Sequence, residues 1–318
     1  MTSADTVLHG VTIRPVAGPD EIALFNRLPY TINHELADDL AEQRRRPGWM
    51  WMALRGDHLL ARVAWWGRGG DDVPLLLDIL DMDDDAEDLT AVGQALYAEA
   101  ARHVVPPGVT PPEYGRFIPA NWRQDPATFR AVRARMAVVA NTGAELTVER
   151  LRLEWRPGAD LPTPDRRLAF RPATDTDELI TLMTRALDGT LDAHSRADLA
   201  QMPAHEAAAQ HYERELATYS SPRRWWQIAT LGEGGEPVGF IIPARNAYHP
   251  VIAYLGVVPE HRGNGYAHGL LAEGTRILAG ENVPRIRAAT DLGNAPMANA
   301  FARAGYVNFE RAINMAWS

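Results

Sequence analysis

The segment RGNGYA, residues 262–267, carries the residue types of an anion-binding loop. It follows an apolar run that ends at Val258, and it opens a segment whose apolar residues have helical spacing. The first amides of a helix have no intrahelical partner and carry the positive end of the helix dipole. Glycines let a phosphate approach the main chain, and Arg262 adds a positive charge at the rim. The segment predicts a phosphate site on the amides from Gly263 to His268.

This segment resembles the pyrophosphate loop of the GNAT superfamily of acetyl-CoA-dependent N-acetyltransferases. In that family an Arg or Gln, a Gly and a final Gly or Ala follow a strand, and here these positions are Arg262, Gly265 and Ala267. Asn294 and the pair Gly305-Tyr306 are similar to the family's later Asn…Gly-Phe motif. On spacing alone, a glycine pair before a helix fits an ordinary tight turn equally well.

The resemblance is specific over residues 250–306, and it implies a bound acyl-coenzyme A, with acetyl-CoA as the acyl donor. The pantetheine arm would pair with the edge of residues 255–258, and a backbone N–H near Val257 would polarise the thioester carbonyl. The residues expected to contact the cofactor are Leu255, Gly256, Val257, Val258, Arg262, Gly263, Asn264, Gly265, Tyr266, Ala267, His268, Asn294 and Phe301.

The usual proton-transfer groups of the family are missing here. Its common glutamate positions hold Ala289 and Val251, and its common tyrosine position holds Phe301. An alkylammonium must lose a proton before it attacks a thioester, so we expect a replacement base. The catalytic candidates are Asp291, at the end of a strand, and His249, just before one. Both residues could instead have a surface or capping role. Tyr306 is a further candidate and is expected in the core. The base could also be the terminal carboxylate of Ser318, or the reaction could need no base at all.

The acceptor side is predicted from a polar segment after the first helix of the second half. Residues 187–199 contain Asp188, Asp192 and His194, whose carboxylates would attract a cationic amine. A solvated turn or a helix cap is the alternative explanation. The spacing of these residues does not match a metal site, and we expect no metal.

The chain repeats itself at an offset of 157 residues, since VTIRPVAGPDEI at 11–22 matches LAFRPATDTDEL at 168–179. The two copies also end alike, with ERLRLEW at 149–155 and ERAINMAW at 310–317. We therefore expect two GNAT-like domains, at 8–155 and 167–318, with a proline-rich linker at 156–166. The expected fold class is α/β (α+β): in each copy a mixed, mostly antiparallel central sheet is flanked by helices.

The first copy lacks the glycine loop. Its corresponding segment is acidic, with Asp78, Asp81, Asp83, Asp84, Asp85, Glu87 and Asp88. Carboxylates at a helix start favour the helix dipole but repel a diphosphate. We expect this degenerate copy to bind no coenzyme A and to act as a scaffold or acceptor-side wall; a solvated acidic loop without further role is the alternative.

Composition excludes several chemistries. The 318-residue chain has no cysteine, and its 32 basic residues are all arginine. This excludes thiol nucleophiles, disulfides and Schiff-base or phosphate-loop lysines. The net charge of −9 argues against nucleic acid as the main partner.

The N-terminal sequence resembles no secretory signal and no apolar run could span a membrane, so we expect a cytoplasmic protein. Because the two copies can pack as a pseudo-dimer, we expect a monomer.

These features favour an N-acyltransferase that moves an acyl group from the thioester directly to a small primary amine. An aminoglycoside-like compound, an amino-sugar conjugate and an amino acid all remain open as acceptors. The alternative is a protein that is not an enzyme: a non-catalytic acyl-CoA-binding or regulatory module. An aminoacyl-tRNA-dependent transferase on the same fold is a third reading, which the negative charge disfavours.

Overall fold

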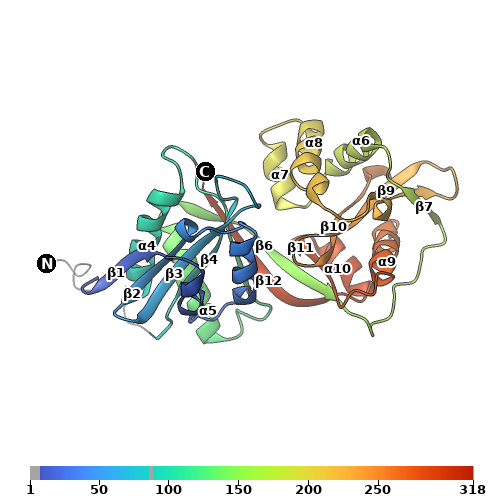
Figure 1. Ribbon diagram of the computed structural model, residues 1–318. Helices are drawn as coiled ribbons and strands as arrows, with labels where there is room; N and C mark the ends of the chain where they lie inside the picture. Colours follow the sequence, from blue (N-terminus) through green and yellow to red (C-terminus); the bar gives the residue numbers. More distant parts are fainter. Residues whose placement is uncertain (1–7, 86–88, 318) are drawn as a thin grey trace. The chain divides into compact units, whose positions relative to one another are not determined.

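The computed structural model describes residues 8–85 and 89–317, which form two compact units. The first unit contains the described chain up to Val148 together with the segment from Ala312 onward, and the second runs from Glu149 to Arg311. Each unit buries its own apolar core, around Leu80 and Leu96 in the first and around Ile241 and Leu270 in the second. Figure 1 shows the elements of both.

The units differ from the sequence-based ranges 8–155 and 167–318 in their last strands. Strand β6 (Ala144–Trp155) ends the first copy, yet from Arg150 onward it pairs with β11 (Ile286–Asp291) of the second copy. Strand β12 (Val307–Trp317) ends the second copy, but its segment from Ala312 belongs to the first unit. Because both copies end on strands with similar alternation, each last strand can fill the other's place. The second unit therefore includes residues of the first copy.

The second unit is a mixed sheet with helices on both faces, which confirms the predicted fold class. Its strands lie in the order β6-β11-β10-β9-β8-β7, and each described pair is antiparallel except β10 with β11. Figure 1 shows α6, α7 and α8 on one side of these strands and α9 and α10 on the other. The further elements are β7 (Leu168–Pro172), α6 (Thr176–Leu187), α7 (Ala193–Leu199), α8 (Ala204–Arg214), η4 (Leu216–Thr218), η5 (Arg223–Trp225), β8 (Gln227–Leu231), β9 (Pro237–Arg245), β10 (Pro250–Val257), η6 (Pro259–His261), α9 (Tyr266–Ala279) and α10 (Ala295–Arg303).

Helix α6 illustrates why these residues form these elements. The Asp175 carboxylate caps its start by accepting hydrogen bonds from the amides of Asp177 and Glu178. Its buried side chains are Leu179, Leu182, Met183 and Leu187, whose spacing of three and four residues defines one face. This face packs against the sheet, so the helix and its last residue, Leu187, are held in place. The loop that follows Leu187 is positioned by this helix.

Strands β10 and β11 separate as they run towards their carboxyl ends. They are paired at Val251 and Arg287, and no further pair of residues joins them in the described chain. The register of β10 against β9 shifts between Ile252 and Tyr254, which marks a bulge. A bulge bends a strand and increases its twist, so it directs the rest of β10 away from β11. The separation opens a space between two neighbouring strands.

The first unit repeats this plan. Its strands β1 to β5 lie in sequence order, and β4 pairs parallel with β5 at Leu77 and Tyr114. Its elements are β1 (Val11–Pro15), η1 (Pro19–Glu21), α2 (Ile22–Phe25), η2 (Asn33–Glu35), α3 (Leu36–Ala41), η3 (Pro47–Trp49), β2 (Met50–Arg55), β3 (His58–Trp66), β4 (Leu76–Met82), α4 (Leu89–Val104), β5 (Tyr114–Pro119) and α5 (Pro126–Ala140). Of the acidic residues predicted before α4, Glu87 and Asp88 lie outside the described residues.

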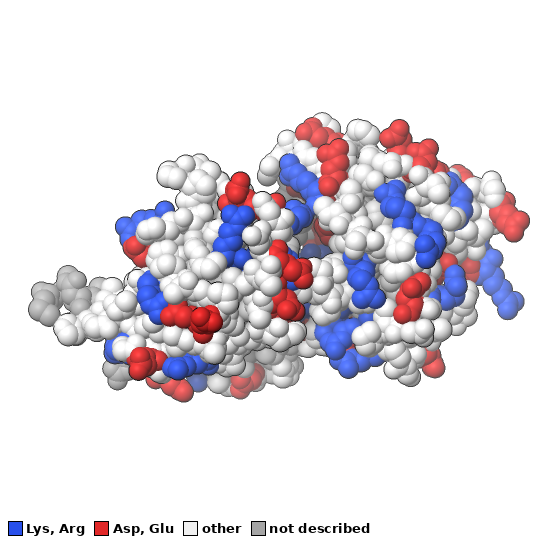
Figure 2. Space-filling view, viewed as in Figure 1, with Lys and Arg blue, Asp and Glu red and all other residues white. Residues whose placement is uncertain are grey.

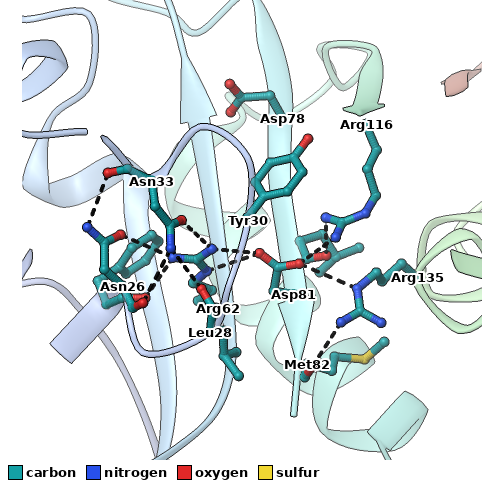
Figure 3. A network of polar contacts seen from close by, with 12 residues as sticks. Asn26, Leu28, Tyr30, Asn33, Arg62, Asp78, Asp81, Met82, Arg116 and Arg135 are labelled. Carbon is teal, nitrogen blue, oxygen red and sulfur yellow. Dashed lines mark hydrogen bonds and ion pairs between the residues drawn. The ribbon is translucent and has the colours of Figure 1, made fainter. Parts of the chain in front are cut away.

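A buried ionic network fills the end of β4 in the first unit (Figure 3). Asp81 is 1% exposed and accepts hydrogen bonds from Arg62 and Arg116 at 2.9 and 2.7 Å, with Arg135 3.4 Å away. Arg116 also donates to the Leu80 carbonyl, and Arg135 donates to the Met82 carbonyl. Two of the expected acidic surface residues are thus buried partners of arginine: Asp81 here, and Asp78 with Arg45. A solvated acidic loop is therefore the wrong description for Asp78 and Asp81.

The surface carries charges of both signs. On the face drawn in Figure 2, acidic and basic side chains alternate without a continuous basic area on either unit. None of the helices in the described ranges is both long and apolar enough to cross a membrane.

Candidate active site

A cavity of about 600 Å³ opens in the second unit where β10 and β11 separate. Its walls are the edge of β10 from Ile252 to Val257, the start of α9, one face of α10 and the loop after α6. Four elements far apart in the sequence thus converge on one space. The cavity has two chemically different ends: the glycine loop at one, and the charged side chains that follow α6 and β11 at the other.

The glycine loop has the geometry of an anion cradle. Gly263 and Gly265 have φ angles of 81° and 80°, in the left-handed region that side chains other than glycine rarely adopt. A Cβ atom at either position would meet nothing within 4 Å, so the space above the backbone is open. No side chain caps α9, whereas Asp175, Asp192 and Asn294 cap α6, α7 and α10. Its first amides have no side-chain cap, as in α8, and they are therefore accessible to an anion.

One amide of the predicted set is already used. The His268 N–H donates to the Gly265 carbonyl at 3.0 Å, and His268 does not line the cavity. Asn264 is exposed beside the cavity, where its side chain donates to the carbonyls of His261 and Arg262. The cradle consists of the main chain from Gly263 to Ala267.

Arg262 holds the loop in place rather than standing free at its rim. Its guanidinium donates to three carbonyls: Val257 at 3.0 Å, Ala186 at 2.8 Å and Asp188 at 2.5 Å. The last two terminate α6, where unpaired carbonyls and the negative end of the dipole favour a cation. Arg262 thereby ties the glycine loop to the end of α6 and to β10. Asp188 contributes its carbonyl to this contact, and its side chain does not line the cavity.

The edge of β10 offers backbone groups to the cavity. Val258 is fully buried and its N–H donates to Val238 of β9 at 2.9 Å, so it does not face the site. Successive N–H groups of a strand point to opposite sides, so the Val257 N–H points towards β11. Gly256 permits this arrangement, because a Cβ there would lie 2.8 Å from Ala186 and 2.9 Å from Phe240. The Val257 N–H is thereby directed into the space between β10 and β11.

Helix α10 forms the opposite wall with residues three and four apart. Asn294 caps the helix by accepting from the Met297 amide at 3.3 Å, which leaves its NH₂ group directed away from the cap. Phe301 is 1% exposed, packs edge-on against Tyr306 and contributes apolar surface. Arg303, on the same face, has no carboxylate partner within the described chain. It supplies a cation to the cavity, as a polyanionic ligand requires.

At the other end of the cavity, Arg150 and Asp192 line the wall, and Asp291 lies behind them in contact with Arg150. Arg150 of β6 lies opposite Asp291 of β11, and its Nε is 3.0 Å from Asp291 Oδ1. Its Nη2 is 3.6 Å from Asp192 Oδ2, longer than a hydrogen bond. Asp192 also caps α7 by accepting from the Ser195 amide at 2.8 Å. Asp291 accepts from the Ala193 amide at 2.6 Å and so holds the loop after α6 against β11.

The two carboxylates differ in acidity. Burial raises the pKa of Asp291, which is 3% exposed, and it outweighs the hydrogen bond from Ala193. Burial alone would also raise the pKa of Asp192, but the Ser195 amide and the Arg150 guanidinium bring it below its ordinary value. Asp192 is therefore the ionised carboxylate of the cavity wall, and Asp291 lies behind it.

The structure brings most of the predicted site residues together. The predicted residues that line the cavity are Leu255, Gly256, Val257, Arg262, Gly263, Gly265, Tyr266, Ala267, Asn294, Phe301 and Asp192. Those that do not line it are Val258, Asn264, His268, Asp188, His194, His249 and Asp291. His249 lies in the turn before β10, where its amide donates to Asn246 Oδ1. Within the described ranges, no three His, Asp or Glu side chains gather as a metal site would require.

Sequence reasoning missed Arg150, Tyr254 and Arg303 in the cavity wall. Arg303 follows Asn299 and Ala300 at helical spacing, so the pattern of α10 could have indicated it. Tyr254 sits at the bulge of β10, which alternation alone does not predict. Arg150 belongs to the first copy, and only the strand exchange brings it into the second unit.

Residues 193–306 match the family model described as Acetyltransferase (GNAT) family. This range contains β10, the glycine loop, α9 and α10, which form most of the cavity. No curated protein sequence matches the chain significantly.

Two solved structures similar over nearly the whole chain support the tandem fold. A GCN5-related N-acetyltransferase from Sphaerobacter thermophilus is 14% identical with a TM-score of 0.61, over 96% of this chain and 95% of that one. A tandem GNAT protein from the clavulanic acid biosynthesis pathway is 15% identical with a TM-score of 0.55, over 96% and 98%. At these identities the likeness establishes the fold: two GNAT-like units in one chain.

Proposed function

Because the chain carries an acetyltransferase domain of the GNAT family at residues 193–306, we propose that its second unit is an acyl-CoA-dependent N-acyltransferase. The donor is acetyl-CoA and the acceptor is a small primary amine. One observation supports this most strongly: the space between β10 and β11 is continuous with the uncapped glycine start of α9. A long ligand with a phosphate at one end and a reactive group at the other fits such a cavity.

The residues present suit acyl-CoA, which when bound supplies an activated thioester carbonyl. The amides from Gly263 to Ala267 would hold the pyrophosphate, and Arg303 would add charge. The unpaired edge of β10 would bind the pantetheine amides in the way an added strand does. The Val257 N–H would donate to the thioester oxygen, where negative charge develops during transfer.

In the proposed transfer, an acyl group moves from the sulfur of the thioester to the nitrogen of the amine. The amine nitrogen attacks the thioester carbon, the C–N bond forms and the C–S bond breaks. The amine releases a proton, and the departing thiolate of coenzyme A takes one up. The products are an amide and the free thiol, without any oxidant or reductant.

Two side chains are candidates to accept the amine proton. Asp291 has a raised pKa, as a proton acceptor needs, but its oxygens are directed at Ala193 and Arg150. A proton from the amine can therefore reach Asp291 only past Asp192 or through a water molecule. His249 does not line the cavity. We therefore retain Asp291 ahead of His249 as the proposed base.

We propose that the first unit binds no coenzyme A. At the corresponding end of β4, the carbonyls of Leu80 and Met82 already accept hydrogen bonds from Arg116 and Arg135. These carbonyls are two residues apart and so lie on the same edge, where an added strand would pair. The Arg116 guanidinium also stacks on the Tyr30 ring, 4.4 Å from its centre. In β10 a single arginine, Arg262, takes the last carbonyl of this edge, at Val257, whereas in β4 two arginines take two successive carbonyls of it.

Isothermal titration with acetyl-CoA and a thiol-release assay with a panel of small amines test this function together. We expect one binding site per chain and amine-dependent release of coenzyme A. Binding without release for every amine would favour the non-catalytic acyl-CoA-binding module instead. Two sites per chain would contradict the account of the first unit, and no binding would contradict the function itself. The formal net charge of −9 disfavours a tRNA-dependent transferase.

A further inference from the structure

Arg150 changes the chemistry of the acceptor end of the cavity. With Asp192 and Asp291 alone this end would be strongly negative and would attract any cationic amine. Arg150 contacts both carboxylates and lines the cavity itself, with 29% of its side chain exposed. At contact distance its charge cancels much of the attraction that Asp192 would exert on a simple ammonium group. An acceptor with only a positive charge is poorly matched to this wall.

The guanidinium retains unused hydrogen-bonding capacity. Its Nε faces Asp291 at 3.0 Å, but the pair lacks hydrogen-bond alignment, and both atoms are buried without another partner. Its Nη2 is 3.6 Å from Asp192, beyond hydrogen-bond range. In the described part of the chain, no acceptor takes a hydrogen bond from the terminal nitrogens of Arg150. A guanidinium fork with free terminal donors at a cavity wall is suited to a carboxylate.

Asp192 and Arg150 therefore present opposite charges side by side. Asp192 is held ionised and oriented by the Ser195 amide, and its second oxygen faces Arg150. Ligands whose ammonium and carboxylate groups are separated by one carbon carry the complementary pair at a similarly short separation. The carboxylate would lie on the Arg150 fork and the amine beside Asp192. Thr190, Ser195 and Thr290 supply further polar surface at this end.

From this geometry we infer that the acceptor is an α-amino acid, bound through Arg150 as the specificity-determining residue. The inference rests on the proposed function and narrows its acceptor from small amines in general to zwitterions. Ile252, Leu191 and the ring of Tyr254 line the same cavity, so acceptors with apolar side chains are used for the test. Arg150 contacts the acceptor carboxylate and takes no part in bond formation.

The test compares matched acceptors in the thiol-release assay with acetyl-CoA. The pairs are L-leucine with isopentylamine, L-phenylalanine with phenethylamine, and each amino acid with its amide. We expect kcat/KM to be about 100-fold or more higher for each amino acid than for its analogue without a carboxylate. The analogue would leave the Arg150 guanidinium unpaired in the bound state. R150Q should remove this preference by raising KM for the amino acid, while the Kd for acetyl-CoA stays unchanged.

Two further variants separate recognition from folding. R150K keeps the charge but loses the fork, and it should retain part of the preference. R303Q alters another cavity arginine, and it should weaken acetyl-CoA binding while leaving the preference intact. Equal use of both members of each pair by the wild type, or an equal loss for both in R150Q, would overturn the inference while the proposed function stands. Binding of N-acetyl-L-phenylalanine, measured by thermal shift, gives a second readout without turnover; no binding by the wild type would also overturn it.

Discussion

Gly265→Val should raise the Kd for acetyl-CoA about 100-fold or more, which corresponds to roughly 2.7 kcal/mol. Gly265 has a φ of 80°, where a β-branched residue is strongly disfavoured. The variant must either carry strain of about 1–2 kcal/mol or rearrange the start of α9. In either case the added side chain occupies the open space through which the phosphate would reach the amides. Isothermal titration with acetyl-CoA measures the change directly.

Gly234→Val is the matched control for this prediction. Gly234 lies in the turn between β8 and β9, has a φ of 70° and is likewise open above its Cβ position. The two variants should therefore lose similar thermal stability, but only Gly265→Val should lose affinity. If both bind acetyl-CoA as the wild type does, the phosphate site is not on this loop.

Asp81→Asn should destabilise the first unit by about 3–5 kcal/mol. Asp81 is buried and forms ion pairs with Arg62, Arg116 and Arg135. Removal of its negative charge leaves these three buried guanidinium groups without their shared carboxylate. Burial alone would raise the pKa of Asp81, but the three arginines outweigh it and hold the pKa below its ordinary value. The carboxylate is thus ionised when folded. Denaturant unfolding, with hydrogen exchange to locate the change in the first unit, measures the loss.

The pH dependence gives this prediction a second check. Since the pKa of Asp81 is lower when folded than when unfolded, the unfolded chain takes up the proton first as the pH falls. The contribution of Asp81 is fully present above about pH 4–5 and is lost in more acidic solution. Asp81→Asn should therefore flatten the acid limb of the stability curve. Asp84→Asn is the control, because its partly exposed pair with Arg135 should contribute less than about 1 kcal/mol. Equal effects of the two substitutions would contradict a network centred on Asp81.

The local elements of the second unit could be predicted well from sequence. The strand at 168–172, the helix at 176–187 and the helix that begins at 266 occur as the periodicity indicates, because each buries one face against the same sheet. The start of β8 at Gln227 is less evident from the sequence, since η5 turns the chain just before it, at Arg223–Trp225. The glycine loop was predictable because its chemistry is carried by consecutive residues.

Contacts between distant segments could not be predicted in the same way. The place of Arg150 depends on which sheet β6 joins, and alternation within the strand is the same in either sheet. The acidic segment before α4 reads as a solvated loop, yet Asp78 and Asp81 are buried because arginines from separate elements reach them. The role of Arg262 differs from expectation for a similar reason: its acceptors are carbonyls at the end of α6. Long arginine side chains find partners that local patterns do not specify.

A crystal structure of the chain grown with excess acetyl-CoA tests the central claim most directly. The account predicts one molecule in the second unit, with its pyrophosphate on the amides from Gly263 to Ala267 and its thioester oxygen at the Val257 N–H. It also predicts that Arg116 and Arg135 still cover β4 in the first unit. An empty cavity between β10 and β11, or a ligand whose phosphates lie away from the start of α9, would contradict the account.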